Sequence, residues 1–153
     1  MKKEEPVERL IAECFSIARS ALLKGNEPFG ALLARDGRVV LTAENTVNTD
    51  GDPTKHAELN LVSRAVRSLP PETLAHCTLY TSTEPCVMCA GAIYWAGIPR
   101  IVYGCSTEAL AGITGGCFAV PCREIFAKGG RKTEVMGPVA EEEGSRILRE
   151  FWN

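Results

Sequence analysis

The fold of this chain is decided by residues 77–89, CTLYTSTEPCVMC, in which a β-strand leads directly into a helix. Residues 77–82 form a short run suited to a strand that is buried in a sheet. Pro85 suits the first turn of a helix, because the missing N–H of proline is not needed there. We therefore predict a strand over residues 77–82, followed by a helix over residues 85–96.

Working outward, the rest of the chain alternates between strand-like and helical segments. Asp36-Gly37 between two apolar runs is a strong signal for a β-hairpin, which makes the sheet mixed. We predict five strands, over residues 29–34, 39–43, 77–82, 100–103 and 133–136. We predict five helices, over residues 6–24, 55–68, 85–96, 106–110 and 141–152. Thr54 is the expected N-cap of the second helix. This order predicts an α/β fold, a three-layer α/β/α sandwich with a mixed five-stranded sheet.

Length and charge narrow the class of protein. A chain of 153 residues, 45% of them hydrophobic, suits a single domain over residues 1–153. With 17 Lys and Arg against 19 Asp and Glu, the net charge of −2 argues against general affinity for nucleic acid or anionic membranes. No apolar run approaches the roughly 20 residues of a membrane span, and no secretory signal opens the chain. We expect a cytoplasmic protein.

The seven cysteines are the most distinctive feature of the composition. In a reducing compartment, closely spaced cysteines bind metal or carry out redox chemistry more often than they form disulfides. Cys86 and Cys89 lie three residues apart in the first turn of a predicted helix, where the helix dipole favours the thiolates that bind zinc. His56, at the start of another predicted helix, offers a third ligand. Three protein ligands are typical of a catalytic zinc ion, whose bound water has a pKa near 7.

Glu58 is the residue best placed to carry protons at such a site. At a helix N-terminus, the side chains of His56 and Glu58 can both lean over the helix end toward a metal ion. Two other uses of the cysteines stay open, a non-catalytic interaction module stabilised by zinc and a redox pair of the thioredoxin type. The first has no obvious fourth ligand, and the second leaves His56 and Glu58 without a role.

His56-Ala57-Glu58 together with Pro85-Cys86-Val87-Met88-Cys89 is the signature of zinc-dependent base deaminases. On these motifs the chain resembles the cytidine/deoxycytidylate deaminase superfamily, and most closely its bacterial guanine deaminase and tRNA adenosine deaminase branch. The likeness extends through residues 28–31, the loop at Asn45, and residues 52–54, 81–84 and 90–95. It covers roughly residues 6–104, about two thirds of the chain.

The resemblance implies a cytidine deaminase-like fold and Zn²⁺ as the cofactor. It implies hydrolytic deamination of a free nucleobase, nucleoside or related aminated heterocycle, in which zinc-bound hydroxide attacks, Glu58 shuttles protons and ammonia leaves. It also implies that Asn45, Phe29, backbone N–H groups near Ala57 and Cys86, and Trp95 contact the substrate. Plain packing is the alternative for Phe29 and Trp95, and a bond to its own backbone is the alternative for Asn45. Relatives in this branch further imply a homodimer, to which the apolar Phe151-Trp152 could contribute.

Departures from the family bear on the substrate. A tRNA adenosine deaminase is the nearest alternative. Residues 123–153 hold six basic and six acidic side chains, so this segment has no excess of positive charge with which to bind tRNA. Where the guanine deaminase pattern reads Gly-Phe-Asp-Asp, this chain has Gly112-Ile113-Thr114-Gly115, and the missing acid argues against guanine itself. We expect residues 105–130 to decide the substrate.

We assign no metal ligand or catalytic role to most of the remaining cysteines or to the second histidine. We expect Cys14 and Cys77 in the core, and His76 in a turn rather than at a metal. Cys105, Cys117 and Cys122 lie in the stretch expected to decide the substrate, where the last two could also reach one another or a second metal.

Overall fold

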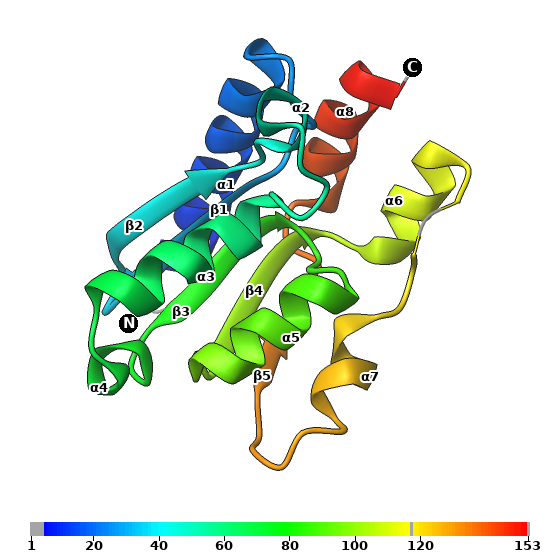
Figure 1. The fold of residues 1–153 in the computed structure, drawn as a ribbon. Helices are drawn as coiled ribbons and strands as arrows, with labels where there is room; N and C mark the ends of the chain where they lie inside the picture. Colours follow the sequence, from blue (N-terminus) through cyan, green and yellow to red (C-terminus); the bar gives the residue numbers. More distant parts are fainter. Residues whose placement is uncertain (1–4, 117, 153) are drawn as a thin grey trace.

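The computed structural model describes residues 5–116 and 118–152, and Figure 1 shows a central sheet with helices on both faces. The strands are β1 (Gly30–Arg35), β2 (Arg38–Glu44), β3 (Thr78–Thr83), β4 (Arg100–Cys105) and β5 (Glu134–Met136). The helices are α1 (Glu5–Leu23), α2 (Val47–Asp50), α3 (Ala57–Ser68), α4 (Pro71–Leu74), α5 (Val87–Ala96), α6 (Thr107–Thr114), α7 (Cys122–Phe126) and α8 (Glu141–Trp152).

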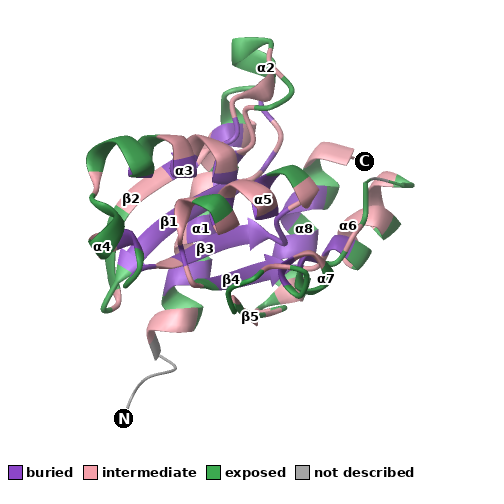
Figure 2. Ribbon diagram, turned by 60° about the horizontal axis from the view of Figure 1, so that its bottom comes forward, coloured by how far each residue is buried: buried purple, intermediate pink, exposed green. Residues whose placement is uncertain are grey.

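The sheet is mixed, with the strand order β2-β1-β3-β4-β5. Strand β1 is antiparallel to both β2 and β3, whereas β3, β4 and β5 run parallel to one another. Figure 2 shows the three central strands, β1, β3 and β4, as almost wholly buried. The predicted three-layer sandwich with a mixed five-stranded sheet is confirmed.

Two apolar clusters hold the layers together. On one face, residues of α3, α5 and α7 pack on the sheet around Leu61, Ile93 and Phe126. On the other face, α1 and α8 pack on it around Leu10, Phe15 and Ile147. Burial of each such side chain contributes about 1.5–3 kcal/mol.

The direction of the central strands determines where helix N-termini gather. Because β3 and β4 are parallel, their carboxyl ends lie at the same edge of the sheet, and α5 and α6 begin directly after them. In open α/β sheets, ligands bind outside the carboxyl ends of the strands. The connection between β3 and α5, which contains Cys86, therefore lies at the edge of the sheet where a ligand is expected.

Several local predictions were wrong. Thr54 does not cap α3; the helix begins at Ala57 with His56 at the N-cap position, and Thr54 bonds to Asp52 Oδ1 through its N–H (2.9 Å) and hydroxyl (2.7 Å). The expected loop before it contains the short helix α2, and α6 continues to Thr114 rather than ending at residue 110. Helices α4 and α7 were not predicted, because four- and five-residue helices are too short to show an apolar period.

Within residues 5–116 and 118–152, no helix combines the length and the apolar character that crossing a membrane requires.

Candidate metal centre and active site

Three side chains from two helix starts converge on one point. His56 is the N-cap residue of α3, Cys86 is the N-cap residue of α5, and Cys89 lies in the first turn of α5. Nδ1 of His56 lies 3.6 Å from Sγ of Cys86 and 3.7 Å from Sγ of Cys89. Among the residues that the structure describes, this is the one group of His, Cys, Asp or Glu whose ligand atoms cluster closely enough to hold a metal ion.

The three ligand atoms fit a tetrahedral zinc ion. With Zn–N and Zn–S bonds of about 2.0–2.3 Å, the N···S edge of a tetrahedron is about 3.6 Å, which matches both separations. A hydrogen bond from Cys89 lowers the pKa of Cys86 to about 4, and its contact with His56 acts in the same direction. That hydrogen bond to Cys86, together with burial, raises the pKa of Cys89. At least one thiolate is therefore present at neutral pH, in the form that binds zinc.

Glu58 lies in the first turn of α3, beside these ligands, and is only 6% exposed. Its Oε2 accepts a hydrogen bond of 3.0 Å from the hydroxyl of Thr81 on β3. Burial raises the pKa of Glu58 to about 7, and the nearby charge of Cys86 raises it as well. A carboxyl group with this pKa can both accept and donate a proton near neutral pH.

Two adjoining cavities open in front of the cluster. The inner cavity, of about 70 Å³, is lined by His56, Glu58 and Cys86 together with Phe29, Thr83, Glu84 and Leu110. The outer cavity, of about 280 Å³, shares His56, Cys86 and Phe29 with it and adds residues of 107–118, Glu27 and Trp152. The outer cavity alone lies just below the roughly 300 Å³ at which pockets for drug-sized ligands begin, so this space suits a small ligand.

Glu84 fixes one wall of these cavities and was not singled out from the sequence. Its buried carboxylate accepts hydrogen bonds from the backbone N–H of Thr107 at Oε1 (2.9 Å) and of Cys122 at Oε2 (2.6 Å). It thereby joins the starts of α6 and α7 to the turn that carries Cys86. Its position directly before Pro85 was the available signal.

The structure brings some of the expected substrate contacts to the cavities. Phe29 lines both of them, whereas Asn45 and Ala57, the buried first residue of α3, line neither. Asn45 is fully buried, and its Oδ1 accepts a hydrogen bond of 3.0 Å from Val47 N–H. Within the described residues, its Nδ2 has no hydrogen-bond partner. Trp95 is 84% exposed near the end of α5 and lines neither cavity, so the chain does not bring its indole to its own metal centre.

Residues 4–105 match the model of the family described as "Cytidine and deoxycytidylate deaminase zinc-binding region". The chain belongs to this deaminase family. The deaminase is similar to the Schizosaccharomyces pombe protein named "Probable cytosine deaminase", with 37% identity over 149 residues, 94% of this chain and 90% of that protein. The family assignment makes the chain a zinc-dependent deaminase, and the recognition made from its two motifs is confirmed.

Other relatives carry different names. The guanine deaminase of Bacillus subtilis is 46% identical over 76 residues, which is 50% of this chain and 49% of that protein. The tRNA-specific adenosine deaminase of Agrobacterium fabrum is 36% identical over 138 residues, which is 88% of this chain and 86% of that protein. The solved structure of the guanine deaminase from Nitrosomonas europaea has a TM-score of 0.81 at 24% identity, covering 94% of this chain and 82% of that one. At 24% identity, the structural similarity supports the assignment of the fold alone.

The other cysteines that the structure describes are buried and do not belong to the ligand group. Cys14 and Cys77 lie in the core, as predicted. Cys105 is buried with its Sγ 3.5 Å from the hydroxyl of Ser145, and Cys122 is buried at the start of α7. Cys117 lies outside the described residues. His76 is in the turn after α4, with Nδ1 2.9 Å from the carbonyl oxygen of Glu72.

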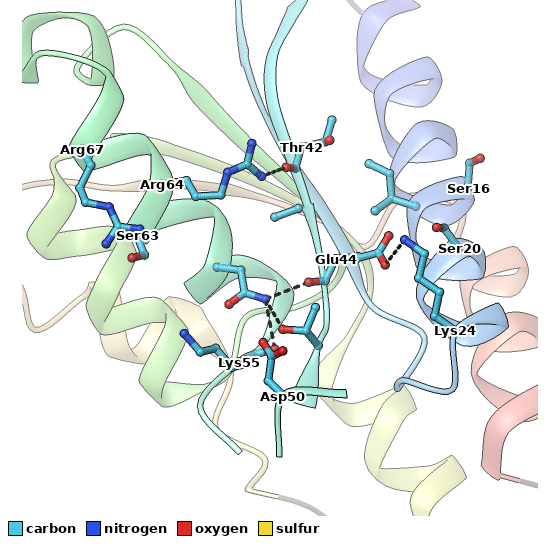
Figure 3. A pocket seen from close by; sticks show the side chains of 14 residues that line it. Ser16, Ser20, Lys24, Thr42, Glu44, Asp50, Lys55, Ser63, Arg64 and Arg67 are labelled. Carbon is cyan, nitrogen blue, oxygen red and sulfur yellow. Dashed lines mark hydrogen bonds and ion pairs between the residues drawn. The ribbon is translucent and has the colours of Figure 1, made fainter. Parts of the chain in front are cut away.

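A wider groove of about 750 Å³ runs along the outer edge of β2, between α1 and α3 (Figure 3). None of the three ligand residues or Glu58 lines it. Arg64 and Asn60 donate hydrogen bonds to the backbone carbonyls of Thr42 (2.5 Å) and Glu44 (2.9 Å), and Lys24 pairs with the Glu44 carboxylate (2.8 Å). The contacts from Arg64 and Asn60 occupy carbonyl groups of an edge strand, which protects the sheet against the addition of a further strand.

Proposed function

We propose that this deaminase hydrolyses the amino group of a free nucleobase, a nucleoside or a related aminated heterocycle. His56, Cys86 and Cys89 hold zinc, and Glu58 moves the protons. The observation that carries the proposal is that Glu58 and two of the three ligand residues line one inner cavity, with a carboxyl pKa of about 7.

The reaction replaces an exocyclic amine by oxygen, so that water is consumed and ammonia leaves. Bound zinc supplies Lewis acidity, which brings the pKa of water close to 7. The Glu58 carboxylate accepts one proton from the attacking water and delivers it to a ring nitrogen. It then takes the second proton from the hydroxyl added to the ring carbon and delivers it to the departing amine, which leaves as ammonia. Thr81 holds Oε2 of Glu58 in place by its 3.0 Å hydrogen bond, and the buried surroundings exclude bulk water.

Three residues contact the ring in this proposal. Phe29 forms an apolar wall of both cavities. The proposal assigns the backbone N–H groups at the N-terminus of α3, near Ala57, to the edge of the ring. Asn45 donates a hydrogen bond from its Nδ2, which the described residues leave without a partner. Such a buried donor favours a bound acceptor, since leaving it unsatisfied costs about 1–3 kcal/mol.

A tRNA substrate is the second candidate, because a relative of 36% identity is named a tRNA-specific adenosine deaminase. The outer cavity favours a small molecule instead, since the described residues that line it include no Lys or Arg. Binding of tRNA needs cationic side chains that neutralise phosphates. Ammonia release from an anticodon stem-loop, compared with release from free bases and nucleosides, separates the two candidates.

We also propose that residues 1–153 act as one deaminase domain in the cytoplasm, where thiolate ligands stay reduced.

A homodimer is also part of the proposal. Met88 (36% exposed) and Trp95 (84% exposed) lie seven residues apart on α5 and so share one helix face. Trp95→Glu should turn the dimer into a monomer in analytical ultracentrifugation, whereas Leu23→Glu, at the exposed end of α1, should not. A wild-type monomer at micromolar concentration would contradict the dimer.

The replacement Glu58→Ala tests the proposed mechanism. We expect loss of ammonia release for every base while zinc stays near one per chain, because the three ligands are untouched. Glu72→Ala, at an exposed position on α4, is the matched control and should keep full turnover. Normal turnover in Glu58→Ala would overturn the role of Glu58.

A further inference from the structure

The charged side chains that line the two cavities include three carboxylates and, among the described residues, no Lys or Arg. Three carboxylates face them, those of Glu27, Glu58 and Glu84. Besides the ligand candidates His56 and Cys86, the other walls are aromatic, aliphatic, hydroxyl-bearing or glycine. An anionic ligand would therefore enter against like charge, whereas a ring with outward N–H groups would meet acceptors.

Two of the three carboxylates are already engaged. Both oxygens of Glu84 accept backbone N–H groups, and Glu58 accepts from Thr81 beside the metal ligands. Glu27 is half-buried on the wall of the outer cavity, and within the described residues its carboxylate makes no hydrogen bond or ion pair. It is the carboxylate that remains free to receive a ligand.

The backbone holds Glu27 at this position. The N–H of Phe29 donates a hydrogen bond of 2.9 Å to the carbonyl oxygen of Glu27, which closes a three-residue turn around Pro28. Proline fixes its own φ, so the turn is stiff and Glu27 keeps a constant relation to the Phe29 wall. Glu27 thus places a carboxylate on the wall of the same outer cavity that Thr114 lines.

We infer that Glu27 is a specificity-determining residue that accepts hydrogen bonds from an N–H edge of the ring. This inference rests on the proposed function for the place of the substrate. A carboxylate is acceptor-only and pairs best with two adjacent N–H donors. The substrate class is therefore an uncharged aminated ring that carries a second donor group besides the amine that leaves, and nucleoside phosphates are excluded.

Matched substrates that differ in one donor test the inference. We compare 2,6-diaminopurine with adenine, and 2,4-diaminopyrimidine with 4-aminopyrimidine, in the zinc-loaded wild type and in Glu27→Gln. The glutamine keeps the shape but replaces one acceptor oxygen by a donor. We expect the wild type to favour each diamino compound in kcat/KM by about tenfold to a hundredfold, which is the range for a hydrogen bond to a charged group. In Glu27→Gln this preference should fall to within about threefold.

Binding isotherms for the same four compounds keep the two proposals distinguishable. If no compound releases ammonia but the donor-dependent binding is lost in Glu27→Gln, the proposed function fails and the role of Glu27 stands. If turnover occurs and Glu27→Gln leaves the preference within each pair unchanged, the role of Glu27 is overturned and the proposed function stands. Glu72→Gln, outside both cavities, is the control and should behave as the wild type.

Discussion

The carboxylate of Glu84 accepts a hydrogen bond of 2.6 Å from the backbone N–H of Cys122, a residue 38 positions later in the chain. Its other oxygen accepts from Thr107, so one buried side chain fixes the starts of two helices. The next residues after Glu84 lead into Cys86, a zinc-ligand candidate. The carboxylate of Glu84 therefore links the starts of α6 and α7, which form a wall of the cavity, to the segment that carries Cys86.

Glu84→Gln should loosen this wall without disturbing the metal centre. The amide can accept only one of the two N–H groups, so we expect the free energy of unfolding to fall by about 1–3 kcal/mol. KM should rise by about tenfold or more, because small displacements of positioning groups weaken binding strongly. The measurements are steady-state kinetics, denaturant unfolding, and the visible spectrum of the Co²⁺-substituted protein, which should stay unchanged.

The matched control for Glu84 is Glu141→Gln. Glu141 Oε2 also accepts a backbone N–H near the start of α6, that of Ser106 at 2.7 Å, but it lines neither cavity. This variant should lose stability and keep its KM. An equal rise of KM in both variants would mean that Glu84 acts through stability alone.

Replacement of Cys89 by serine should remove the metal. A hydroxyl is a much poorer zinc ligand than a thiolate, and two remaining ligands do not make a stable site. We expect elemental analysis to give a small fraction of a zinc ion per chain, with loss of activity. Cys105→Ala, a buried cysteine beside Ser145, should keep zinc near one per chain. Full zinc in Cys89→Ser would contradict the assignment of ligands.

The layers and the metal-ligand candidates could be predicted from sequence because each has a local signal. Strand length, the Asp-Gly turn and a helix starting close to Pro85 can be recognised within a few residues, although α5 begins at Val87 rather than at the predicted residue 85. The two motifs contain the ligand candidates themselves. The partners of Glu84 have no such signal, since they are backbone N–H groups of residues 23 and 38 positions away. Every residue but proline carries that donor, so only the folded chain shows which one is used.

The aromatic side chains show the same limit. Trp152 was expected to contribute to a homodimer; in the structure it lines the outer cavity and packs on Phe29 with ring centroids 5.9 Å apart. Trp95 was expected near the substrate and is exposed on α5. An apolar ring suits a core, a pocket wall or an interface equally well, so its type does not tell which one it occupies.

Stability should fall above about pH 9 because of buried thiols. Burial raises the pKa of Cys14 well above its ordinary value of 9, so the folded chain keeps this thiol protonated while the unfolded chain ionises it. A raised folded-state pKa gives stability that is fully present below the unfolded value and is lost as pH rises above it. At pH 10 the loss from this group should be roughly 1 kcal/mol.

Denaturant unfolding of the wild type and of Cys14→Ala at pH 7 and pH 10 measures this contribution. The variant should be less stable at pH 7, because it lacks a buried side chain, but it should lose roughly 1 kcal/mol less between the two pH values. An identical pH dependence in the two proteins would show that Cys14 ionises as easily in the folded chain as in the unfolded one.

Asn45→Ser should raise KM with little loss of stability. The serine hydroxyl can still accept the N–H of Val47, the bond that Asn45 Oδ1 makes in the turn, but it removes the Nδ2 donor that has no partner in the described residues. Asn26 is the matched control, since its side chain is equally buried and is fully engaged with Asn48 and Thr49. Asn26→Ser should lower the free energy of unfolding and leave KM unchanged. If Asn45→Ser loses stability while keeping its KM, Asn45 is a turn residue and the substrate contact is wrong.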